Sequence, residues 1–319
     1  MKMKRFLVLC LMLAISFNLM ACGKAKDGQE AAPAQKTITI GIMPDVESIP
    51  MIIADRQGFF QKQGVSVKII PFKSAKDRDS ALQAGQLDGM ITDLLAVIFA
   101  NEGGINLRVI SKTDGNIQML GGKDTGINSL ADLKGKSVGL STNTIMEYTV
   151  DRMIATAGLS PQDIQKVAIP QLPNRLEMLN GGKVQACILP DPLAGLAVKG
   201  GAKILYSTDQ TGTRVGAIAF TQKSLQENPD QVKAVFRAYN DAVAYLQNEP
   251  PASYIDYVIQ QQGFAAETKD ILKLPAYKAE PPTEEAFNDV VQWLKGKNLI
   301  KGSYEYNTLV DKTILGSVK

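Results

Sequence analysis

The feature of this sequence that most restricts its fold is a repeated alternation of strand-like and helix-like segments. Runs rich in β-branched residues are each followed by a segment with helical spacing or a helix-capping pattern. Strands that alternate with helices of about 8 to 15 residues form a parallel sheet that those helices cover. We therefore expect an α/β fold. Its first strands are predicted at residues 37–43, 65–72, 89–92 and 107–112.

A second series of the same kind follows, and the chain is long enough to bury two hydrophobic cores. Beyond Gly216 the pattern becomes mainly helical. We expect two α/β lobes joined by two crossovers. The strands of the second series are predicted at residues 136–141, 167–169, 184–189 and 202–206. Lobe 1 is predicted to comprise residues 37–115 and 215–319, and lobe 2 residues 116–214.

The N-terminus has the layout of an export signal. Basic residues at its start precede an apolar run, 6–19, of about 14 residues, which is shorter than the roughly 20 residues of a membrane-spanning helix. The run ends at Leu19-Met20-Ala21-Cys22, which resembles the bacterial lipobox. We predict a signal peptide over residues 1–21, a lipid on Cys22 and a polar tether over residues 22–36. The alternative is an ordinary signal peptide with a chance cysteine at its end.

The charge balance argues against two classes of partner. The chain has 35 basic and 32 acidic residues, and loss of Lys2, Lys4 and Arg5 with the leader leaves 32 of each. A near-neutral mature protein lacks the positive field that attracts nucleic acid or an anionic membrane surface. We therefore expect an extracytoplasmic protein that is held at the cell membrane by its lipid alone and binds no nucleic acid.

The cysteine and histidine content argues against several kinds of catalytic and metal site. Cys10 lies in the predicted leader and Cys22 would carry the lipid, so Cys187 is the remaining thiol of the mature chain. Its apolar neighbours predict a buried strand rather than a nucleophile. The chain contains no histidine, which argues against Ser-His and Cys-His catalysis and against most zinc sites. We expect no catalytic residue, no cofactor and no metal.

Four spaced motifs occur in order along residues 54–192. They are Ala54-x-x-x-Gly58-Phe59-Phe60-x-x-x-Gly64-Val65-x-Val67, Ala81-Leu82-x-x-Gly85-x-Leu87-Asp88-Gly89, Leu130-x-x-Leu133-x-Gly135-Lys136-x-Val138-Gly139, and Leu179-x-x-Gly182-Lys183-Val184-x-Ala186 followed by Pro190-Asp191-Pro192. Taken in this order, they resemble the substrate-binding family of ABC transporters whose members bind sulfonates, taurine, nitrate or thiamine-pyrimidine precursors, the NMT1/THI5-like group. One departure is Gln185, where the family often has an acid.

The resemblance implies the type II periplasmic-binding-protein fold, in which two lobes close around a small molecule. It also implies an ABC permease and ATPase as partners and a monomeric binding protein. Independently of the resemblance, ligands of open parallel sheets lie beyond the carboxyl ends of the strands, near helix N-termini. That rule and the helix-start pattern after the fifth predicted strand select twelve candidate ligand-binding residues: Asp45, Ser48, Ser74, Thr92, Asp93, Ser141, Thr142, Asn143, Thr144, Glu147, Arg175 and Asp191.

Several of these residues have an alternative structural role. Ser74 has the position of a helix N-cap, and Thr144 with Glu147 matches a capping box. Asp191 lies between two prolines, where an aspartate often bonds its own backbone. A cation in the first helical turn, such as Arg175, opposes the helix dipole and so calls for an anionic partner. Asp45 and Asp93 end apolar strands, and we expect them to face the cleft.

The charges of the candidate residues favour one class of ligand. Asp45, Asp93 and Asp191 outnumber Arg175, and a buried unpaired carboxylate beside an anion is costly. We therefore favour a neutral or cationic nitrogen heterocycle, such as a vitamin or pyrimidine precursor. An oxyanion such as an alkanesulfonate, taurine or nitrate is the alternative.

Three aromatic residues, Phe72, Phe99 and Tyr148, could stack on a flat ring or simply pack in the core. Two other functional classes are less consistent with the sequence. A THI5-like biosynthetic enzyme would need a histidine and would not be exported. An adhesive surface lipoprotein would show repeats or an exposed aromatic patch.

Overall fold

The computed structural model describes residues 36–212 and 214–318 of the 319-residue chain. The predicted signal peptide, the predicted lipid site Cys22 and nearly all of the predicted tether lie outside the described residues. Lys36, which we placed at the end of the tether, belongs to the compact unit Lys36–Lys319. Its Nζ atom lies 2.6 Å from a carboxylate oxygen of Asp88.

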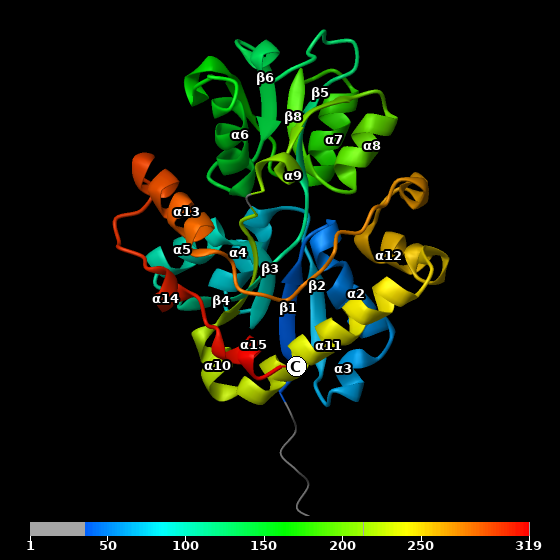
Figure 1. Ribbon diagram of the computed structural model, residues 1–319, viewed down its shortest axis with the longest axis vertical. Coiled ribbons are helices and arrows are strands. Elements are labelled where there is room, and N and C mark those ends of the chain that lie inside the picture. Colours follow the sequence, from blue (N-terminus) through cyan, green and yellow to red (C-terminus); the bar gives the residue numbers. More distant parts are fainter. Residues whose placement is uncertain (1–35, 213, 319) are drawn as a thin grey trace, which may run out of the picture. The chain divides into compact units, whose positions relative to one another are not determined.

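The compact unit contains two five-stranded sheets among its described residues, each with helices around it (Figure 1). The two sheets have the same strand order. The first sheet runs β2 (Val67–Pro71), β1 (Ile38–Ile42), β3 (Gly89–Asp93), β10 (Gly216–Thr221) and β4 (Leu107–Lys112). The second runs β7 (Gln165–Ala168), β6 (Ser137–Leu140), β8 (Ala186–Pro190), β5 (Ile117–Gly121) and β9 (Lys203–Ser207).

Helices connect these strands and complete the C-terminal third of the chain. Those between the strands of the first sheet are the 3-10 helix η1 (Val46–Ser48), α2 (Ile49–Arg56), α3 (Phe59–Lys62), α4 (Ala75–Gln83) and α5 (Leu94–Glu102). Those of the second sheet are η2 (Ala131–Leu133), α6 (Ile145–Ala155), η3 (Pro161–Asp163), α7 (Leu172–Asn180), α8 (Leu193–Lys199) and α9 (Thr208–Thr211). The C-terminal ones are α10 (Gln222–Glu227), α11 (Pro229–Asn248), η4 (Pro251–Ser253), α12 (Ile255–Gln262), η5 (Ala266–Asp270), α13 (Glu284–Gly296), α14 (Tyr306–Leu309) and α15 (Thr313–Gly316).

The expectation of purely parallel pairing is wrong for one strand of each sheet. β10 pairs antiparallel with β3 and β4, and β5 pairs antiparallel with β8 and β9. β5 follows the crossover into the second lobe and β10 follows the crossover back. Neither strand is connected to the preceding strand of its own sheet by a helix that packs on that sheet. Both therefore lack the βαβ connection that gives parallel pairing. The prediction of a mainly helical chain after Gly216 therefore misses strand β10, and the helical part begins at Gln222.

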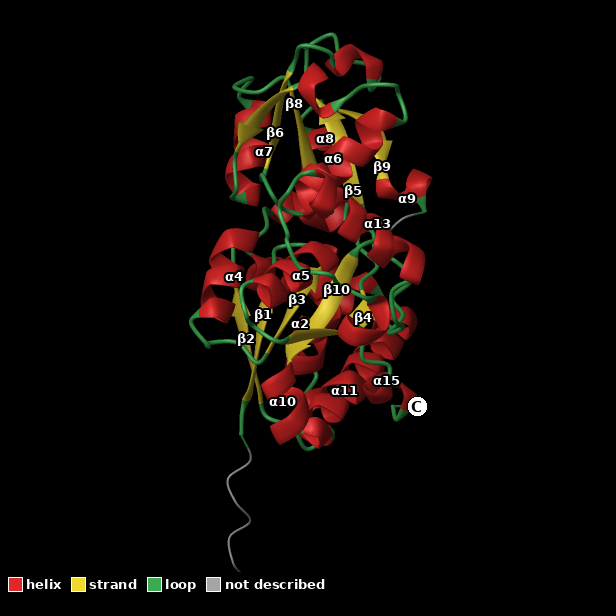
Figure 2. Ribbon diagram, turned by 90° about the vertical axis from the view of Figure 1, so that its left-hand side faces the viewer, coloured by secondary structure: helices red, strands yellow, loops and turns green. Residues whose placement is uncertain are grey.

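The first sheet is buried on both faces. Successive side chains of a strand point to opposite faces, and Met90 and Ile91 of β3 accordingly belong to two different core clusters. One cluster lies under α2 and α11, and the other under α5 and α13. In the view of Figure 2, helices flank the strands of this sheet on both sides. The long helix α11 thus returns the C-terminal part of the chain to the first lobe.

The second lobe has its own core, which contains Cys187. This residue is 0% exposed, as predicted for a core thiol. Burial raises the pKa of the Cys187 thiol to about 12, so the reactive thiolate is not populated near neutral pH. The described residues also contain no helix with both the length and the apolar composition needed to cross a membrane.

The two lobes are connected by more than the two crossovers. The chain passes between the sheets through residues 113–116 and returns through residues 208–215. In addition, α13 packs on α5 of the first lobe, while its Asp289 bonds to Arg152 of α6 in the second lobe. These are the type II periplasmic-binding-protein features expected from the sequence: two α/β lobes, two crossovers and a cleft between them.

Candidate functional site

Of the cavities between the lobes, two adjoin each other and contain most of the predicted site residues that reach a cavity. The carboxylate chamber, of about 50 Å³, is named for Asp45, Glu47, Asp93 and Asp191 in its wall. The arginine chamber, of about 150 Å³, is named for Arg152 and Arg214. Both chambers lie at the carboxyl ends of parallel strands, where the sequence rule placed the ligand. The chambers share four wall residues: Glu47, Gly115, Ile117 and Ile145.

Two buried aspartates of the first lobe form part of the carboxylate chamber. Asp45 caps η1 and accepts hydrogen bonds from the backbone N–H and the hydroxyl of Ser48, at 3.2 and 3.1 Å. Asp93 caps α5 and accepts one from the N–H of Ala96 at 2.9 Å. Burial raises the pKa of Asp45 well above its ordinary value, and the neighbouring charge of Glu47 adds to this. Burial also raises the pKa of Asp93 to about 6.

Arg78 and Thr92, in the same wall, carry polar atoms without a hydrogen-bond partner among residues 36–212 and 214–318. Arg78 is 3% exposed, and its Nη1 donates to the carbonyl of Ile91 at 3.0 Å. Its Nη2 lies 2.8 Å from Asp79 and 4.0 Å from Asp93, but makes no hydrogen bond. Thr92 is 4% exposed, and its hydroxyl is also unpartnered. Buried polar groups are normally paired, so these two atoms mark where a ligand would complete the bonding.

The second lobe contributes Asp191, Ser141 and Thr144 to the carboxylate chamber. The Asp191 carboxylate accepts hydrogen bonds from the side-chain amides of Gln118 and Asn116, at 2.8 and 3.2 Å. Burial raises the pKa of Asp191. The Asp191 carbonyl also accepts the backbone N–H of Val46, at 3.0 Å, which joins the two lobes across the cleft. Asp191 bonds the side chains of residues 116 and 118 instead of its own backbone.

Several of the predicted residues do not line either chamber. The Ser48 hydroxyl accepts the N–H of Met43 at 3.3 Å. Ser74 caps α4 through the N–H of Asp77, as its alternative role predicts. Thr142 and Asn143 are exposed. These four positions follow strand ends, but their side chains are used locally or face solvent.

Glu147 lies in an ion network outside both chambers. It accepts the N–H of Asn143 at 2.6 Å and lies 2.8 Å from Lys166 and 2.5 Å from Lys297. Burial alone would raise the pKa of Glu147, but the N–H of Asn143 and the two lysines lower it below its ordinary value. Lys297 belongs to the C-terminal segment after α13, so this network also ties the lobes together.

Arg175 has no anionic partner among the described residues. It is 0% exposed and donates to the carbonyls of Ile169 and Ile188 and to the hydroxyl of Ser141. Burial lowers the pKa of Arg175 to about 10. The carbonyl oxygens of Ile169, just after β7, and of Ile188, within β8, therefore take the place of the anion that the helix-dipole argument called for.

Arg78 is the counterpart of Arg175 in the first lobe. Each arginine is the fourth residue of its helix, α4 or α7, and each donates from Nη1 to a carbonyl 13 residues further on. The two environments differ, because Arg78 faces carboxylates in the chamber whereas Arg175 does not. Sequence reasoning selected Arg175 and missed Arg78, although their local patterns are equivalent and do not distinguish the one that faces the chamber.

Glu47 is the second residue of the site that sequence reasoning missed. Its carboxylate accepts the hydroxyl of Thr113 at 2.5 Å and the N–H of Gly115 at 3.3 Å, both in the first crossover. A Cβ atom on Gly216, beside the second crossover, would lie 2.5 Å from Glu47 Oε1. Burial raises the pKa of Glu47. These partners are remote in sequence, so no local pattern distinguishes Glu47 from a solvated residue of a short turn.

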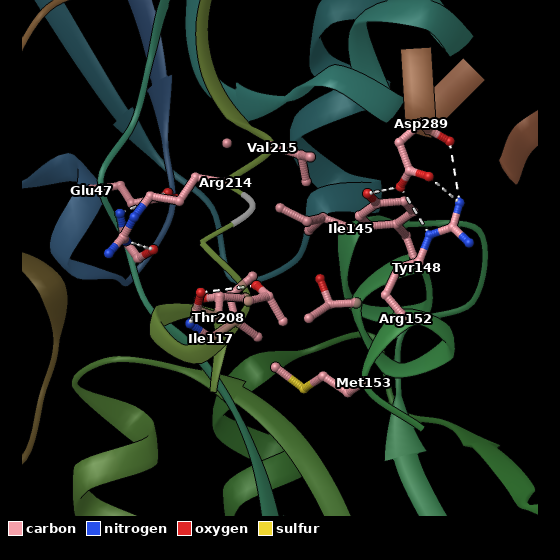
Figure 3. A pocket seen from close by; sticks show the side chains of 14 residues that line it. Glu47, Ile117, Ile145, Tyr148, Arg152, Met153, Thr208, Arg214, Val215 and Asp289 are labelled. Carbon is pink, nitrogen blue, oxygen red and sulfur yellow. Dashed lines mark hydrogen bonds and ion pairs between the residues drawn. The ribbon is translucent and has the colours of Figure 1, made fainter. Parts of the chain in front are cut away.

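The arginine chamber is closed on one side by a contact between the lobes (Figure 3). Asp289 of α13 accepts hydrogen bonds from Arg152 Nε at 2.9 Å, Arg152 Nη2 at 2.7 Å and the Tyr148 hydroxyl at 2.5 Å. On the opposite wall, Arg214 donates to Asp209 at 2.6 Å and lies near Glu47. Arg152 Nη1 has no hydrogen-bond partner in the described part of the chain.

Only one of the three aromatic candidates reaches a chamber. Tyr148 lines the arginine chamber and packs edge-on against Trp293, with ring centroids 5.7 Å apart. Phe72 and Phe99 are partly buried against the hydrophobic cores. Within residues 36–212 and 214–318, no three cysteine, aspartate or glutamate side chains are arranged to hold a metal ion.

The sequence is similar to those of proteins named for solute binding. A Bacillus subtilis protein named "Putative aliphatic sulfonates-binding protein" is 27% identical over 246 residues, which cover 74% of this chain and 73% of that protein. A Brachyspira hyodysenteriae protein named "Putative ABC transporter periplasmic binding protein" is 23% identical over 255 residues, which cover 75% and 73%.

The fold is similar to that of a solved binding protein. The alkanesulfonate-binding protein SsuA of Xanthomonas axonopodis pv. citri, bound to MOPS, superposes with a TM-score of 0.75 at 19% identity, covering 88% of this chain and 99% of that one. The family model described as NMT1/THI5 like matches residues 45–253, which is more than half of the chain. The chain therefore belongs to the NMT1/THI5-like family.

Proposed function

We propose that this protein is the extracytoplasmic solute-binding component of an ABC importer. It captures a small molecule in the two chambers between its lobes and delivers it to a permease and ATPase. The observation that carries the proposal is the cleft itself, which combines residues of both lobes and leaves the Thr92 hydroxyl and Arg78 Nη2 without a hydrogen-bond partner among the described residues. The names of the similar proteins support the same role.

The ligand class has two candidates, and different observations favour each. The similar proteins named for sulfonates support an oxyanion more strongly than the nitrogen heterocycle favoured by the sequence. The buried carboxyl groups of the carboxylate chamber favour a ligand with amino or ring N–H donors, because an anion would be repelled there. In the arginine chamber, Arg152 and Arg214 are paired with Asp289 and Asp209, and Nη1 of Arg152 is a donor that an oxyanion can meet.

Calorimetric titration of the purified protein tests the proposal. The panel comprises alkanesulfonates, nitrate and aminopyrimidines, and native mass spectrometry of freshly purified protein identifies any ligand that co-purifies. We expect one class to bind at micromolar or lower concentration and to be recovered unchanged. Chemical conversion of the bound compound, or no binding by any small molecule, would contradict a transport role.

The absence of histidine and the buried thiol of Cys187 support binding rather than catalysis. We also propose that the protein acts as a monomer and is anchored by a lipid on Cys22. Replacement of Cys22 by serine should move the protein from the detergent phase to the aqueous phase in a phase-partition experiment on whole cells. A Cys22→Ser variant that stays in the detergent phase would rule out the lipid anchor and leave the binding function intact.

A further inference from the structure

We infer that the second lobe pivots on the contact between α6 and α13, which stays formed when the cleft opens, while the contact between α8 and η5 separates. These two contacts are called the α6–α13 joint and the α8–η5 contact. The inference goes beyond the proposed binding function, because it concerns how the lobes move and does not depend on the ligand.

At the α6–α13 joint, an aromatic side chain of the second lobe is built into a core of the first. Tyr148 of α6 is 3% exposed and belongs to a hydrophobic cluster whose other buried members, within the described part of the chain, come from residues 81–109 and 215–310. Its ring packs edge-on against Trp293 of α13, and its hydroxyl donates to Asp289 at 2.5 Å. Separation of α6 from α13 would withdraw this ring from a close-packed core and leave its hydroxyl without the carboxylate.

Buried charges beside the ring strengthen the same joint. Glu147 and Asp151 of α6 are 4% and 7% exposed. Lys166 of the second lobe contacts both carboxylates and balances only part of their negative charge. The first lobe supplies the rest, because Lys297 lies 2.5 Å from Glu147 and the indole N–H of Trp293 donates to Asp151 at 3.1 Å. Removal of one partner from a buried charged group is strongly destabilising, so this joint resists separation.

The α8–η5 contact lacks both features. Its ion pair joins Lys199 to Asp270 at 3.2 Å, and the two side chains are 44% and 74% exposed. An ion pair that is exposed to water to this extent contributes little to stability. The apolar part of the contact brings Ile271 against Gly195, which has no side chain to pack, and Phe264 is only partly buried against the core of the second lobe. The α8–η5 contact is therefore the weaker of the two.

The mouth of the cleft lies on the side away from the joint. There the N–H of Leu172, at the start of α7, donates to the carbonyl of Lys73, just before α4, at 3.2 Å. In Figure 2, α4 and α7 lie on the left, whereas α13 and α9 of the second crossover lie on the right. Arg214 of that crossover donates from Nη1 to the carbonyls of Asp114 and Gly115 in the first, at 2.7 and 2.6 Å, and so ties the crossovers together. Rotation about the crossovers and the joint opens the mouth.

Distances between paired spin labels, measured by double electron–electron resonance on the ligand-free protein, test the inference. One pair spans the α8–η5 contact and the other spans the α6–α13 joint, all at exposed positions. The pairs are Val198→Cys with Glu267→Cys, and Ala155→Cys with Gln292→Cys. The background is the full chain with Cys10→Ser and Cys22→Ser, in which the buried Cys187 takes no label. We expect a short and a longer population for the first pair and one narrow population for the second.

Charge reversal should shift the populations at the α8–η5 contact. Lys199→Glu places like charges beside each other and should increase the longer population about two- to fivefold. Addition of Asp270→Lys to the same chain restores the attraction and should reverse the change. Lys203→Glu is the matched control, because Lys203 is also exposed but bonds to Asn128 within the second lobe. It should change neither label pair.

A disulfide across the α8–η5 contact gives a second measurement. A Cβ atom on Gly195 would lie 3.7 Å from Cβ of Ile271, which is within the range of a disulfide. Two amides bond across the cleft, the N–H of Val46 to Asp191 and that of Leu172 in the mouth. Oxidation of the Gly195→Cys, Ile271→Cys variant should slow hydrogen exchange of both amides about tenfold or more, and reduction should restore it.

Asp289→Asn distinguishes a pivot from a latch at the α6–α13 joint. We expect its label pair to keep one narrow population, because the ring of Tyr148 stays in the core. A second population for this pair, beside a single one for the α8–η5 pair, would reverse the two roles. A single population for the α8–η5 pair even in Lys199→Glu, or amide exchange that oxidation does not change, would overturn the inference. Each of these outcomes leaves the proposed binding function standing, because no ligand is used.

Discussion

Replacement of Asp93 by asparagine is expected to stabilise the ligand-free protein at neutral pH. The carboxyl group of Asp93 is 3% exposed, and burial raises its pKa from 3.8 to about 6. Ionisation of a carboxyl group whose folded-state pKa is raised this far lowers the free energy of unfolding by roughly 3 kcal/mol at a pH above 6. Asparagine removes the charge and keeps a side-chain oxygen that can still accept the N–H of Ala96.

The pH dependence gives the prediction its sign. Because the folded-state pKa of Asp93 is raised, the folded state holds the proton more tightly than the unfolded chain does. The stability associated with this group is therefore fully present below the ordinary pKa of 3.8 and is lost as the pH rises through about 6. Asp93→Asn should match the wild type at acidic pH and exceed its stability at pH above 6, by roughly 1 to 3 kcal/mol.

Urea and thermal unfolding, followed by circular dichroism on both sides of this pH range, measure the effect. Asp93→Ala is the matched control, because it removes the same charge and also the helix cap. It should be less stable than Asp93→Asn by about 1 kcal/mol. The reasoning is refuted if Asp93→Asn is less stable than the wild type at neutral pH, or if the difference does not shrink in acid. A stabilising replacement that weakens ligand binding would mark Asp93 as a residue retained for function.

The remaining predictions concern the stability of the folded chain. Arg175→Met should cost about 3 to 5 kcal/mol in urea unfolding, because two buried carbonyls lose their donors; a cost below about 1 kcal/mol would contradict this. Gly216→Ala should lower the Tm, because the added Cβ would meet the side chains of Thr113 and Glu47. Gly296→Ala is the control: nothing lies within 4 Å of its added Cβ, so it should be neutral or slightly stabilising. Equal Tm values for the two variants would be inconsistent with the packing. Lys297→Met removes a cation 2.5 Å from buried Glu147 and should cost about 1 to 3 kcal/mol at neutral pH. The pKa of Glu147 is lowered from 4.5 in the folded state, so the cost of the substitution should fade as the pH falls below 4.5 and through the folded-state pKa. A cost that does not depend on pH would contradict the ion network.

Part of the candidate site could be predicted from the sequence, because it depends on where strands end. Asp45, Thr92 and Asp93 follow strands of the first lobe, and Asp191 follows one of the second, so the topological rule selects them. All four line the carboxylate chamber. The rule does not say which way a side chain points. Ser74 follows a strand equally closely and is used as a helix cap.

The residues that the sequence missed depend on contacts between remote segments. Glu47 reaches the cleft because its partners Thr113 and Gly115 are brought to it by the first crossover. Arg152 reaches it because Asp289, 137 residues further along the chain, holds the guanidinium in place. No periodicity or capping pattern carries such information, since patterning reports on local structure and on burial alone.

The sequence by itself determined the α/β class, the two lobes and the burial of Cys187, because hydrophobic periodicity and helix caps are local properties of the chain. Only the tertiary structure decided the antiparallel strands β5 and β10, since their direction depends on how each crossover enters its sheet. It also decided the charge of each chamber. Arg78 and Arg175 occupy equivalent positions in sequence and topology and both donate to a carbonyl, yet only Arg78 also lies beside carboxylates. Electrostatic environment is set by which segments meet in space, and that information is distributed over the whole fold.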